Sequence, residues 1–461
     1  MNQAIFREYD IRGIADTDLT DEVANAIGKA YGTYVKRKEA KSVSVGCDVR
    51  LTSPRLKAAV IEGIQTTGVN IVDVGTVPTP VLYFSVFHYD TDGGMMITGS
   101  HNPIEYNGFK MNMKSGSVFG QEIQVLKHII QTNDFENGDS NIRSENAVPA
   151  YVSMLNEKFN FSKKLKMIMD PGNGTAGPLA SSFFINKGMD VDCIFCEPDG
   201  NFPNHLPDPT VLKYTKALRA KVIESGADIG IGYDGDSDRL GVIDNLGRPI
   251  FADRLLAIMA RDLLSRHPGE KIIFDVKCSQ SLVDEIKKYG GIPLMWKTGH
   301  AILKSKMKEE NSLLAGEMSG HIFFGENYYG FDDAIYASAL MIRILCESDK
   351  TIAEIVDEIP AFYSTPEVRV ECSDEEKFKI VDDLVHYFKS RYEGIDVDGV
   401  RALFGDGWGL VRASNTQPAL VLRMEAKTEE RLKEIIEIFL NKLREFPSVK
   451  VNEEDFVIVK G

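Results

Sequence analysis

The apolar positions in the first three quarters of the chain follow a strand–helix–strand pattern that occurs three times. Each unit opens with an apolar strand that ends at or near an aspartate: Asp48, Asp170 or Asp275. An amphipathic helical segment follows, and then a second apolar strand led by glycine. This spacing predicts a βαβ unit with two parallel strands and a right-handed crossover. The sequence therefore predicts similar domains in series rather than a solenoid, whose repeats are shorter.

From about Thr365 the pattern changes. Strand-like segments now alternate with two charged amphipathic helices, expected at residues 375–392 and 429–446. This order is typical of helices packed on a mostly antiparallel sheet. The predicted fold class is α/β, with three similar mixed α/β domains built on βαβ units and then a smaller α+β C-terminal domain, arranged around a central cleft. The expected domains are 1–148, 149–249, 250–364 and 365–461.

The charge balance narrows the classes of partner. Lys and Arg number 53 against 68 Asp and Glu, so the formal net charge is −15. A chain this acidic is a poor candidate for coating nucleic acid or an anionic membrane. The sequence contains no apolar run of the ~18 residues that a membrane span needs, and its first residues do not resemble a signal peptide. We therefore expect a cytoplasmic protein that binds small molecules.

The six cysteines are scattered, which is typical of reduced thiols rather than of a disulfide framework. Cys193 and Cys196 form a C-x-x-C pair, a spacing that redox and zinc sites also use. No second pair completes a metal site. We therefore expect these two residues to form one wall of a buried strand.

Residues 98–103 (TGSHNP) follow the apolar run GGMMI. One interpretation is a nucleophilic or phosphoryl-carrying Ser100, with His101 and Asn102 orienting oxygen atoms. The other is a turn whose polar residues hydrogen-bond to their own backbone. The G-x-S-x-G elbow of hydrolases is absent, because Pro103 follows Asn102.

Residues 234–239 (DGDSDR) follow a second buried strand. Asp234, Asp236 and Asp238 repel one another at short range, and a divalent cation removes that repulsion. Ligands that are all oxygen atoms favour Mg²⁺. An EF-hand is excluded, because its glycine position holds Arg239 and its final glutamate position holds Asn245. The alternative is an exposed acidic turn, which the flanking apolar strands disfavour.

Residues 316–321 (GEMSGH) lie between two apolar segments. Glu317 and Ser319 are two positions apart, so in an extended segment their side chains face the same side. An acceptor and a hydroxyl side by side could bind neighbouring sugar hydroxyls. A polar loop with its hydrogen bonds satisfied locally is the alternative.

Residues 412–418 (RASNTQP) join two apolar strands. One arginine with two hydroxyls and an amide in a turn is suited to phosphate binding, and a simple polar turn is the alternative. A G-x-G-x-x-G pattern at Gly172, Gly174 and Gly177 would be the corresponding signal for a dinucleotide. The equivalent turns of the two sister units lack these glycines, so we do not expect a dinucleotide.

These four motifs in this order resemble the α-D-phosphohexomutase family, and most closely its phosphomannomutase/phosphoglucomutase branch. The resemblance covers the whole chain. It includes four further segments: YDIRG at 9–13, NGFK at 107–110, DVKC at 275–278 and KTGH at 297–300. It implies reversible transfer of a phosphoryl group between the 1- and 6-positions of mannose and glucose phosphates. The route would pass through a phosphoserine enzyme and a hexose 1,6-bisphosphate intermediate.

The resemblance implies a phosphoserine domain at 1–148, a metal-binding domain at 149–249, a sugar-binding domain at 250–364 and a phosphate-binding C-terminal domain at 365–461. It also implies a role for each matched residue. Ser100 would carry the phosphoryl group, and a phosphate oxygen on it would join Asp234, Asp236 and Asp238 around Mg²⁺. Arg239 and Lys110 would neutralise the moving group. Tyr9, Arg12 and Lys277 would bind the substrate along the cleft, which His300 would also line. Glu317 and Ser319 would bind the sugar O3 and O4, with His321 close by. The phosphate that does not react would be bound by Arg412, Ser414, Asn415 and Thr416. Lys110, His101, His300 and His321 are candidates for the general acid and base.

The same resemblance implies glucose 1,6-bisphosphate or mannose 1,6-bisphosphate as an activator, and a monomer or a dimer. Contacts to O3 and O4 do not distinguish the configuration at C2, where glucose and mannose differ. The phosphates of both sugars are therefore expected substrates. The alternatives are a phosphoglucosamine mutase, a metal-dependent phosphatase using Ser100, and a sugar-phosphate-binding module without turnover. Phosphoglucosamine mutases usually carry Ala before the serine, where this chain has Gly99. Leu206 stands where the family usually has a second His, and no expected role depends on it.

Overall fold

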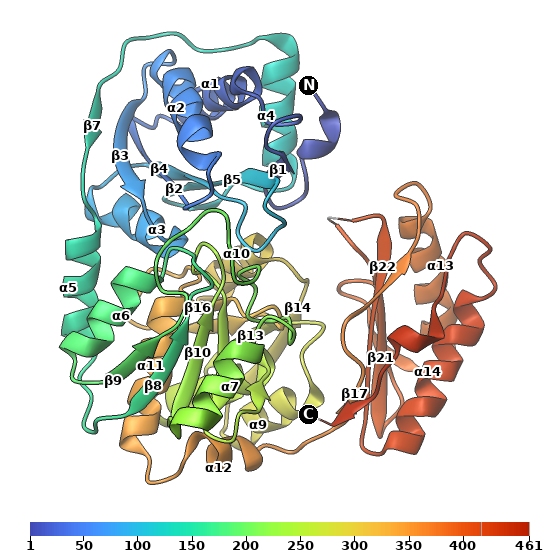
Figure 1. Ribbon diagram of the computed structural model, residues 1–461. Coiled ribbons are helices and arrows are strands. Elements are labelled where there is room, and N and C mark those ends of the chain that lie inside the picture. Colours follow the sequence, from blue (N-terminus) through green and yellow to red (C-terminus); the bar gives the residue numbers. More distant parts are fainter. Residues whose placement is uncertain (416, 461) are drawn as a thin grey trace.

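Four β-sheets with their helices form the protein (Figure 1). The computed structural model describes residues 1–415 and 417–460. In the view of Figure 1 the second and third sheets lie together below the first, and the C-terminal sheet stands to one side. No helix among the described residues is long and apolar enough to cross a membrane.

The first sheet has the strand order β1-β5-β4-β2-β3-β7, with β6 paired to β5. Its strands are β1 (Ile11–Ile14), β2 (Ser42–Cys47), β3 (Asn70–Thr76), β4 (Gly93–Ile97), β5 (Tyr106–Met113), β6 (Gly116–Ser117) and β7 (Ile142–Ser144). The helices of this part are the short 3₁₀ helix η1 (Gln3–Ile5), α1 (Asp21–Arg37), α2 (Ser53–Gln65), α3 (Thr79–His88) and α4 (Gln121–Thr132).

The second and third sheets have the orders β12-β11-β10-β8-β9 and β14-β13-β15-β16. The second contains β8 (Lys166–Asp170), β9 (Asp190–Cys193), β10 (Ile229–Tyr233), β11 (Leu240–Asp244) and β12 (Pro249–Ile250), with α5 (Val148–Lys158), α6 (Gly177–Asn186) and α7 (Lys216–Ser225). The third contains β13 (Lys271–Asp275), β14 (Ile292–Trp296), β15 (Leu314–Gly316) and β16 (Ile322–Phe324), with α8 (Ala252–Arg266), α9 (Gln280–Lys288), α10 (His300–Glu310), α11 (Ala334–Glu347) and α12 (Ile352–Asp357).

The fourth sheet has the order β19-β20-β21-β22-β17-β23, with β18 paired to β22. Its strands are β17 (Tyr363–Ser364), β18 (Val368–Glu371), β19 (Glu393–Ile395), β20 (Val400–Leu403), β21 (Gly407–Ala413), β22 (Ala419–Ala426) and β23 (Val459–Lys460). Its helices are α13 (Lys377–Lys389), α14 (Glu429–Leu443) and the 3₁₀ helix η2 (Glu453–Asp455). The domain boundaries after residues 148, 249 and 364 stay a prediction.

The predicted fold class is confirmed. In each of the three βαβ units the two strands pair in parallel: β2 with β3, β8 with β9, and β13 with β14. The strands of the fourth sheet pair antiparallel in every described ladder. The two expected C-terminal helices form α13 and α14.

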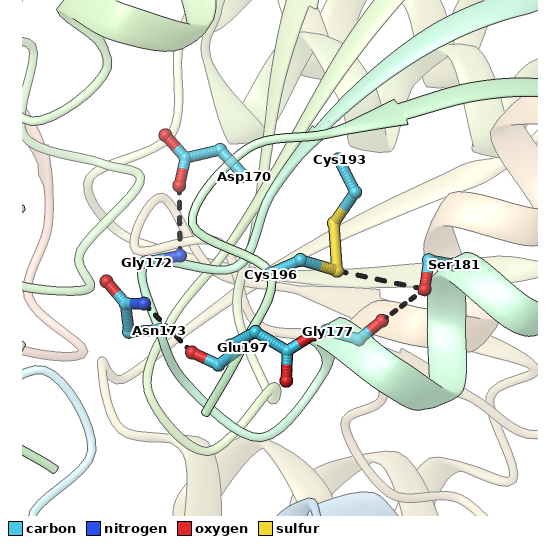
Figure 2. Close-up of a disulfide and its surroundings, with 8 residues drawn as sticks. All are labelled: Asp170, Gly172, Asn173, Gly177, Ser181, Cys193, Cys196 and Glu197. Carbon is cyan, nitrogen blue, oxygen red and sulfur yellow. Dashed lines mark hydrogen bonds between the residues drawn. A yellow bond between two sulfur atoms is a disulfide. The ribbon is translucent and has the colours of Figure 1, made fainter. Parts of the chain in front are cut away.

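The expectation for the C-x-x-C pair was wrong. Strand β9 lies at the edge of its sheet and is exposed or half-buried along its length. An edge strand pairs along one side only, and here no residue of the strand is buried, so it forms no buried wall. The chain turns back after Cys193, with Phe195 at a φ of 51°, and Cys196 meets Cys193 in a disulfide (Figure 2).

The hydrophobic cores divide unequally among the domains. One continuous core joins the second and third sheets and extends to α3 of the first domain. The first and fourth sheets have separate cores. Only a small apolar cluster, Val276 with Trp408 and Leu410, bridges the third and fourth domains among the described residues. Polar contacts therefore contribute much to positioning the C-terminal domain.

Buried arginines of the fourth domain hold one loop of the third. Arg401 donates from Nη1 to the carbonyls of Val276 (2.9 Å) and Cys278 (2.6 Å), and its guanidinium lies 3.6 Å from the ring centre of Trp408. Arg423 donates to the carbonyl of Lys277, the residue between them. The loop that carries Lys277 is thus fixed from the neighbouring domain.

Replacing Gly63 with alanine should destabilise the first domain. Helices α1 and α2 approach so closely there that a Cβ on Gly63 would lie 2.2 Å from the carbonyl oxygen of Asn25. Alanine favours a helix over glycine by about 1 kcal/mol, but overpacking costs about 1–3 kcal/mol. We therefore expect a lower midpoint of the first thermal transition, measured by calorimetry. Gly394→Ala, where the new Cβ makes ordinary contacts of at least 3.4 Å, is the control. A midpoint for Gly63→Ala equal to or above wild type would contradict the prediction.

Candidate active site

The sequence motifs lie where strands end, and all four domains contribute. Residues 98–103 follow β4, 234–239 follow β10, and 276–278 follow β13. Residues 317–321 join β15 to β16, and Ser414 follows β21. Ligands of open α/β sheets bind outside the carboxyl ends of the strands, so this is the expected side of each sheet.

Ser100 is held in a sparsely populated backbone conformation. It is buried, with a φ of 47°, and non-glycine residues in this region are uncommon and concentrate at functional sites. Its Oγ donates to Oδ2 of Asp234 at 2.7 Å and lies 3.0 Å from Nδ1 of His101. The hydroxyl of the first domain therefore points directly at the aspartate loop of the second.

Arg50, which the sequence interpretation did not select, supports this serine loop. Its guanidinium is buried and donates to backbone carbonyls of the loop, including Ser100 at 2.9 Å, Asn102 at 2.6 Å and Tyr106 at 3.0 Å. Beneath it, Asp48 accepts from the amide of Gly99 at 3.0 Å. A signal for Arg50 exists, because it occupies the turn position that Lys277 occupies in the third unit.

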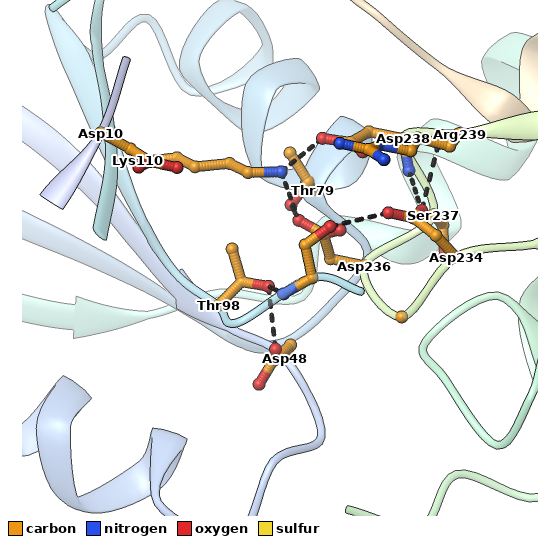
Figure 3. A network of polar contacts seen from close by, with 12 residues as sticks. Asp10, Asp48, Thr79, Thr98, Lys110, Asp234, Asp236, Ser237, Asp238 and Arg239 are labelled. Atoms are coloured by element: carbon orange, nitrogen blue, oxygen red, sulfur yellow. Dashed lines mark hydrogen bonds and ion pairs between the residues drawn. The ribbon is translucent and has the colours of Figure 1, made fainter. Parts of the chain in front are cut away.

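The aspartate loop places three carboxylates together (Figure 3). One oxygen atom from each of Asp234, Asp236 and Asp238 lies within 4.8 Å of the others, and all three residues are buried. Lys110 of β5 donates to Asp236 at 2.7 Å and to Asp238 at 2.5 Å. The remaining Oδ1 atoms of Asp236 and Asp238 are buried without a hydrogen-bond partner among the described residues. Buried carboxylate oxygens in this arrangement fit a divalent cation.

Electrostatics agree with that fit. Burial and the neighbouring carboxylates of Asp238 and Asp236 raise the pKa of Asp234 well above its usual value. Burial also works against ionised Asp236, but the charge of Lys110 together with hydrogen bonds from Lys110 and Thr79 lowers the pKa of this carboxyl. Lys110 and Arg239 supply two positive charges against three carboxylates, so a divalent cation would favour the ionised form of the whole set.

The cations and imidazoles around the loop differ in protonation. Burial opposes the charged form of Lys110, yet Asp236 and Asp238 raise its pKa well above the usual value. Burial, and then the positive charges of Arg239 and Arg12, lower the pKa of His101 well below its usual value. Burial and the positive charge of Lys304 likewise lower the pKa of His300 well below its usual value. Lys110 therefore stays charged while His101 and His300 stay neutral.

Arg239 links the aspartate loop to the third domain. Its Nε donates to Nε2 of His321 at 3.0 Å, so that nitrogen is an acceptor. Nδ1 of His321 then carries the proton, and it lies 2.9 Å from Oδ2 of Asp332. The ring of His300 stacks on that of His321 at 5.4 Å between centroids. Asp332, which is fully buried and was missed from sequence, also accepts from Lys304 at 3.0 Å.

Glu317 and Ser319 meet as expected, but by a different geometry. The segment is a turn rather than an extended strand, since the amide of Gly320 donates to the carbonyl of Glu317 at 3.1 Å. Within this turn Oγ of Ser319 donates to Oε2 of Glu317 at 3.2 Å. The other oxygen, Oε1, accepts from the amide of Gly299 at 2.5 Å.

The fourth domain presents its polar residues toward the third and the first. Arg412 donates from Nε to Asp398 at 2.8 Å, and Lys277 donates to Glu367 of this domain at 3.0 Å. The amide of Asn415 donates to Oη of Tyr9 at 2.6 Å.

Hydrogen bonds therefore connect the domains in a closed circle. Ser100 joins the first domain to the second, and Arg239 joins the second to the third. The amide of Thr298 donates to Asp398 of the fourth domain at 3.1 Å, and Asn415 completes the circle at Tyr9.

The expected site residues form two groups. The first surrounds Ser100: His101, Lys110, Asp234, Asp236, Asp238, Arg239, His300, His321 and Arg12, the last of which pairs with Asp10 at 2.5 Å. The second surrounds Arg412: Tyr9, Lys277, Glu317, Ser319, Asn415 and Ser414, whose Oγ accepts from the amide of Gln417 at 3.1 Å. Tyr9 and His300, with ring centroids 6.4 Å apart, lie between the groups. Thr416 lies outside the described residues.

Four family models match the chain in order. They describe phosphoglucomutase/phosphomannomutase alpha/beta/alpha domains I, II and III at residues 3–137, 149–247 and 251–363, and the C-terminal domain at 367–442. The chain belongs to the phosphoglucomutase/phosphomannomutase family. The family resemblance inferred from the motifs is therefore confirmed.

Relatives of this phosphohexomutase cover almost its whole length. A phosphomannomutase/phosphoglucomutase of Pseudomonas aeruginosa is 44% identical over 442 residues, which is 96% of each chain. A phosphoglucomutase of Neisseria gonorrhoeae is 40% identical over 94% of this chain and 95% of its own. The crystal structure of a phosphoglucomutase/phosphomannomutase family protein from Burkholderia thailandensis superposes with a TM-score of 0.91 at 39% identity, covering 96% of this chain and 98% of that one.

Arg50→Lys should loosen the serine loop. A lysine offers three donors from one point and cannot reproduce the planar fork that reaches several carbonyls at once. We expect amide hydrogen exchange in residues 98–106 to be about tenfold faster or more, measured by mass spectrometry. Arg55→Lys, an arginine of the same domain in exposed ion pairs with Asp16 and Asp21, should leave that exchange unchanged. Equal exchange in both variants would remove the supporting role of Arg50.

Proposed function

We propose that this phosphohexomutase moves a phosphoryl group reversibly between the 1- and 6-positions of glucose and mannose phosphates. The observation that carries the proposal is the contact between Ser100 Oγ and Asp234, with a second group around Arg412 that reaches the first domain through the hydrogen bond of Asn415 to Tyr9. A phosphatase needs one phosphate site and access for water. Two separate groups, one at a buried serine and one at an arginine turn, are suited instead to a sugar with a phosphate at each end.

The metal in this proposal is Mg²⁺. Asp234, Asp236 and Asp238 would hold it, together with an oxygen on Ser100. The ion would neutralise charge on the phosphoryl group. Phosphoryl transfer depends mainly on positioning and charge neutralisation rather than on covalent chemistry by the protein.

The protein's own residues divide the remaining work. In the forward step the bond between phosphorus and Ser100 Oγ breaks and a bond to a sugar hydroxyl oxygen forms, while that hydroxyl gives its proton to a base. Lys110 and Arg239, both positively charged, stabilise the transferring group. When Ser100 is the acceptor instead, its proton can pass to Nδ1 of His101, 3.0 Å away. The neutral state of His101 is the one that can accept it.

The sugar would be held away from the reacting end. Glu317 and Ser319, joined at 3.2 Å, would bind O3 and O4, and Arg412 with Ser414, Asn415 and Thr416 would bind the phosphate that does not react. Since the bisphosphorylated sugar must exchange its two ends, the site has to let it turn. The separate core of the C-terminal domain and its small apolar contact to the third domain support such movement.

³¹P NMR of the purified protein tests this function directly. With glucose 1-phosphate, Mg²⁺ and a trace of glucose 1,6-bisphosphate, we expect the phosphorus signal to move to glucose 6-phosphate, and mannose 1-phosphate to behave alike. Ser100→Ala should lose at least about a thousandfold in turnover, because the carrier oxygen is gone, and should still bind sugar phosphate. Release of inorganic phosphate would favour a phosphatase. Wild-type turnover by Ser100→Ala would remove the carrier role.

Arg412→Ala should weaken substrate binding more than it disturbs folding. A charge-assisted contact of arginine with phosphate contributes about 1.5–3 kcal/mol, so KM should rise about tenfold or more. Steady-state kinetics and thermal unfolding give the two quantities. Arg431→Ala, on α14 in exposed pairs with Asp406 and Glu434, is the matched control. An unchanged KM in Arg412→Ala would contradict the phosphate role.

A further inference from the structure

Cys193 and Cys196 are placed for reversible chemistry. Their Cα atoms are 5.5 Å apart, the two sulfurs are bonded, and both residues are only half-buried. The other four cysteines, Cys47, Cys278, Cys346 and Cys372, are buried free thiols. A C-x-x-C pair at the end of a strand in a βαβ unit is the setting in which thiol–disulfide exchange sites occur.

The turn closed by this disulfide is tied to the loop after β8 (Figure 2). Phe195, at a φ of 51°, accepts at its carbonyl from the amide of Asn173 at 2.9 Å. Nδ2 of Asn173 donates to the carbonyl of Glu197 at 2.8 Å, and the amide of Asp199 donates back to the carbonyl of Asn173 at 2.9 Å. Asn173 thus takes its partners from within the disulfide turn and from the residues that follow it.

The loop after β8 in turn touches the aspartate loop. The amide of Thr175 donates to the carbonyl of Gly235 at 3.0 Å, and its Oγ1 lies 2.8 Å from Oγ of Ser237. A Cβ on Gly174 would lie 2.7 Å from the carbonyl oxygen of Gly235, so the two backbones are in close contact. The disulfide turn therefore contacts the loop after β8, and that loop contacts the aspartate loop that carries the proposed metal ligands.

The chain beyond the disulfide also reaches the serine loop. A Cβ on Gly200 would lie 2.3 Å from the carbonyl oxygen of Val49, so this segment packs directly on the turn that carries Arg50. The ring of Phe202 lies 5.2 Å from the guanidinium of Arg50. Arg50 is the residue that holds the carbonyls of the serine loop. The segment 195–202 therefore braces both loops of the Ser100 group.

We propose that Cys193 and Cys196 form a reversible redox site for small dithiols or a dithiol protein, and that its state controls the order of the serine and aspartate loops. In the reduction a thiolate of the dithiol attacks one sulfur, the bond between the two cysteine sulfurs breaks, and a mixed disulfide forms. The second thiolate of the dithiol then displaces the cysteine. The protein gains two thiols, and the dithiol is oxidised to its cyclic disulfide. This inference rests on the proposed mutase function.

Reduction should lower activity. A bulky residue such as Phe195 at positive φ persists where the surrounding structure enforces it, and the disulfide is one of the constraints that do so. When the ring opens, Phe195 can return to a more favourable conformation and its carbonyl moves away from Asn173. The brace then loosens at both loops, which lowers kcat rather than substrate affinity, because the Arg412 group is untouched.

The test compares the protein before and after treatment with dithiothreitol, and again after reoxidation with oxidised dithiothreitol. Alkylation after denaturation, followed by mass spectrometry, counts the thiols: four are expected in the oxidised form and six in the reduced form. We expect kcat to fall about fivefold or more on reduction and to recover on reoxidation. The double variant Cys193→Ser/Cys196→Ser should have the kcat of the dithiothreitol-treated wild type, and neither reagent should change it. Cys346→Ser should respond to both reagents like wild type.

Two results would overturn the proposal: a kcat that does not change although six thiols are counted, or six thiols that persist after oxidation. Hydrogen exchange of residues 98–106 and 234–239 in both states provides a readout without turnover. If neither form has mutase activity, the proposed function fails. Faster exchange in the reduced form would then still support the redox coupling, and equal exchange would contradict it.

Discussion

Three buried carboxylates in one loop determine how the first two domains meet. Charges of one sign cannot share a site that water does not reach unless donors or cations surround them. The first domain supplies those groups: Thr79 donates from Oγ1 to Asp236 at 2.6 Å, Lys110 bridges Asp236 and Asp238, and Ser100 donates to Asp234. The same contacts that satisfy the aspartates bring the serine to the proposed metal site. The contacts that join the first two domains are therefore the same contacts that form the site.

The fourth domain is attached by a different principle. Its core is its own, and its link to the third domain includes a small apolar cluster and hydrogen bonds from Arg401 and Arg423 to the carbonyls of residues 276–278. Lys277 and the amide of Thr298 add hydrogen bonds to Glu367 and Asp398. Bonds to backbone carbonyls hold a loop without depending on its side chains. The side chain of Lys277 instead pairs with Glu367, within reach of the charge of Arg412. The Ser100 group, by contrast, is held by the contacts of the aspartates with Lys110, Thr79 and Ser100.

The sequence was sufficient where local patterns determine structure. The βαβ units follow from apolar runs and glycine-led strands, and the aspartate triad could be interpreted because its spacing poses an electrostatic problem by itself. Arg50 and Asp332 were missed because their roles depend on distant segments: Arg50 on carbonyls some fifty residues away, and Asp332 on the tautomer of His321. The error at Cys193 has the same origin, since an apolar stretch of sequence does not reveal that its strand lies at a sheet edge.

Position relative to the aspartates also separates two kinds of proton chemistry within one site. Lys110 faces Asp236 and Asp238, so its pKa rises even though it is buried. For His101, burial and then the positive charges of Arg239 and Arg12 lower the pKa. A charged lysine at the aspartates and a neutral imidazole 3.0 Å from the serine hydroxyl thus lie in one site. In the proposed transfer the lysine would stabilise the phosphoryl group, and the imidazole would accept the proton of the serine.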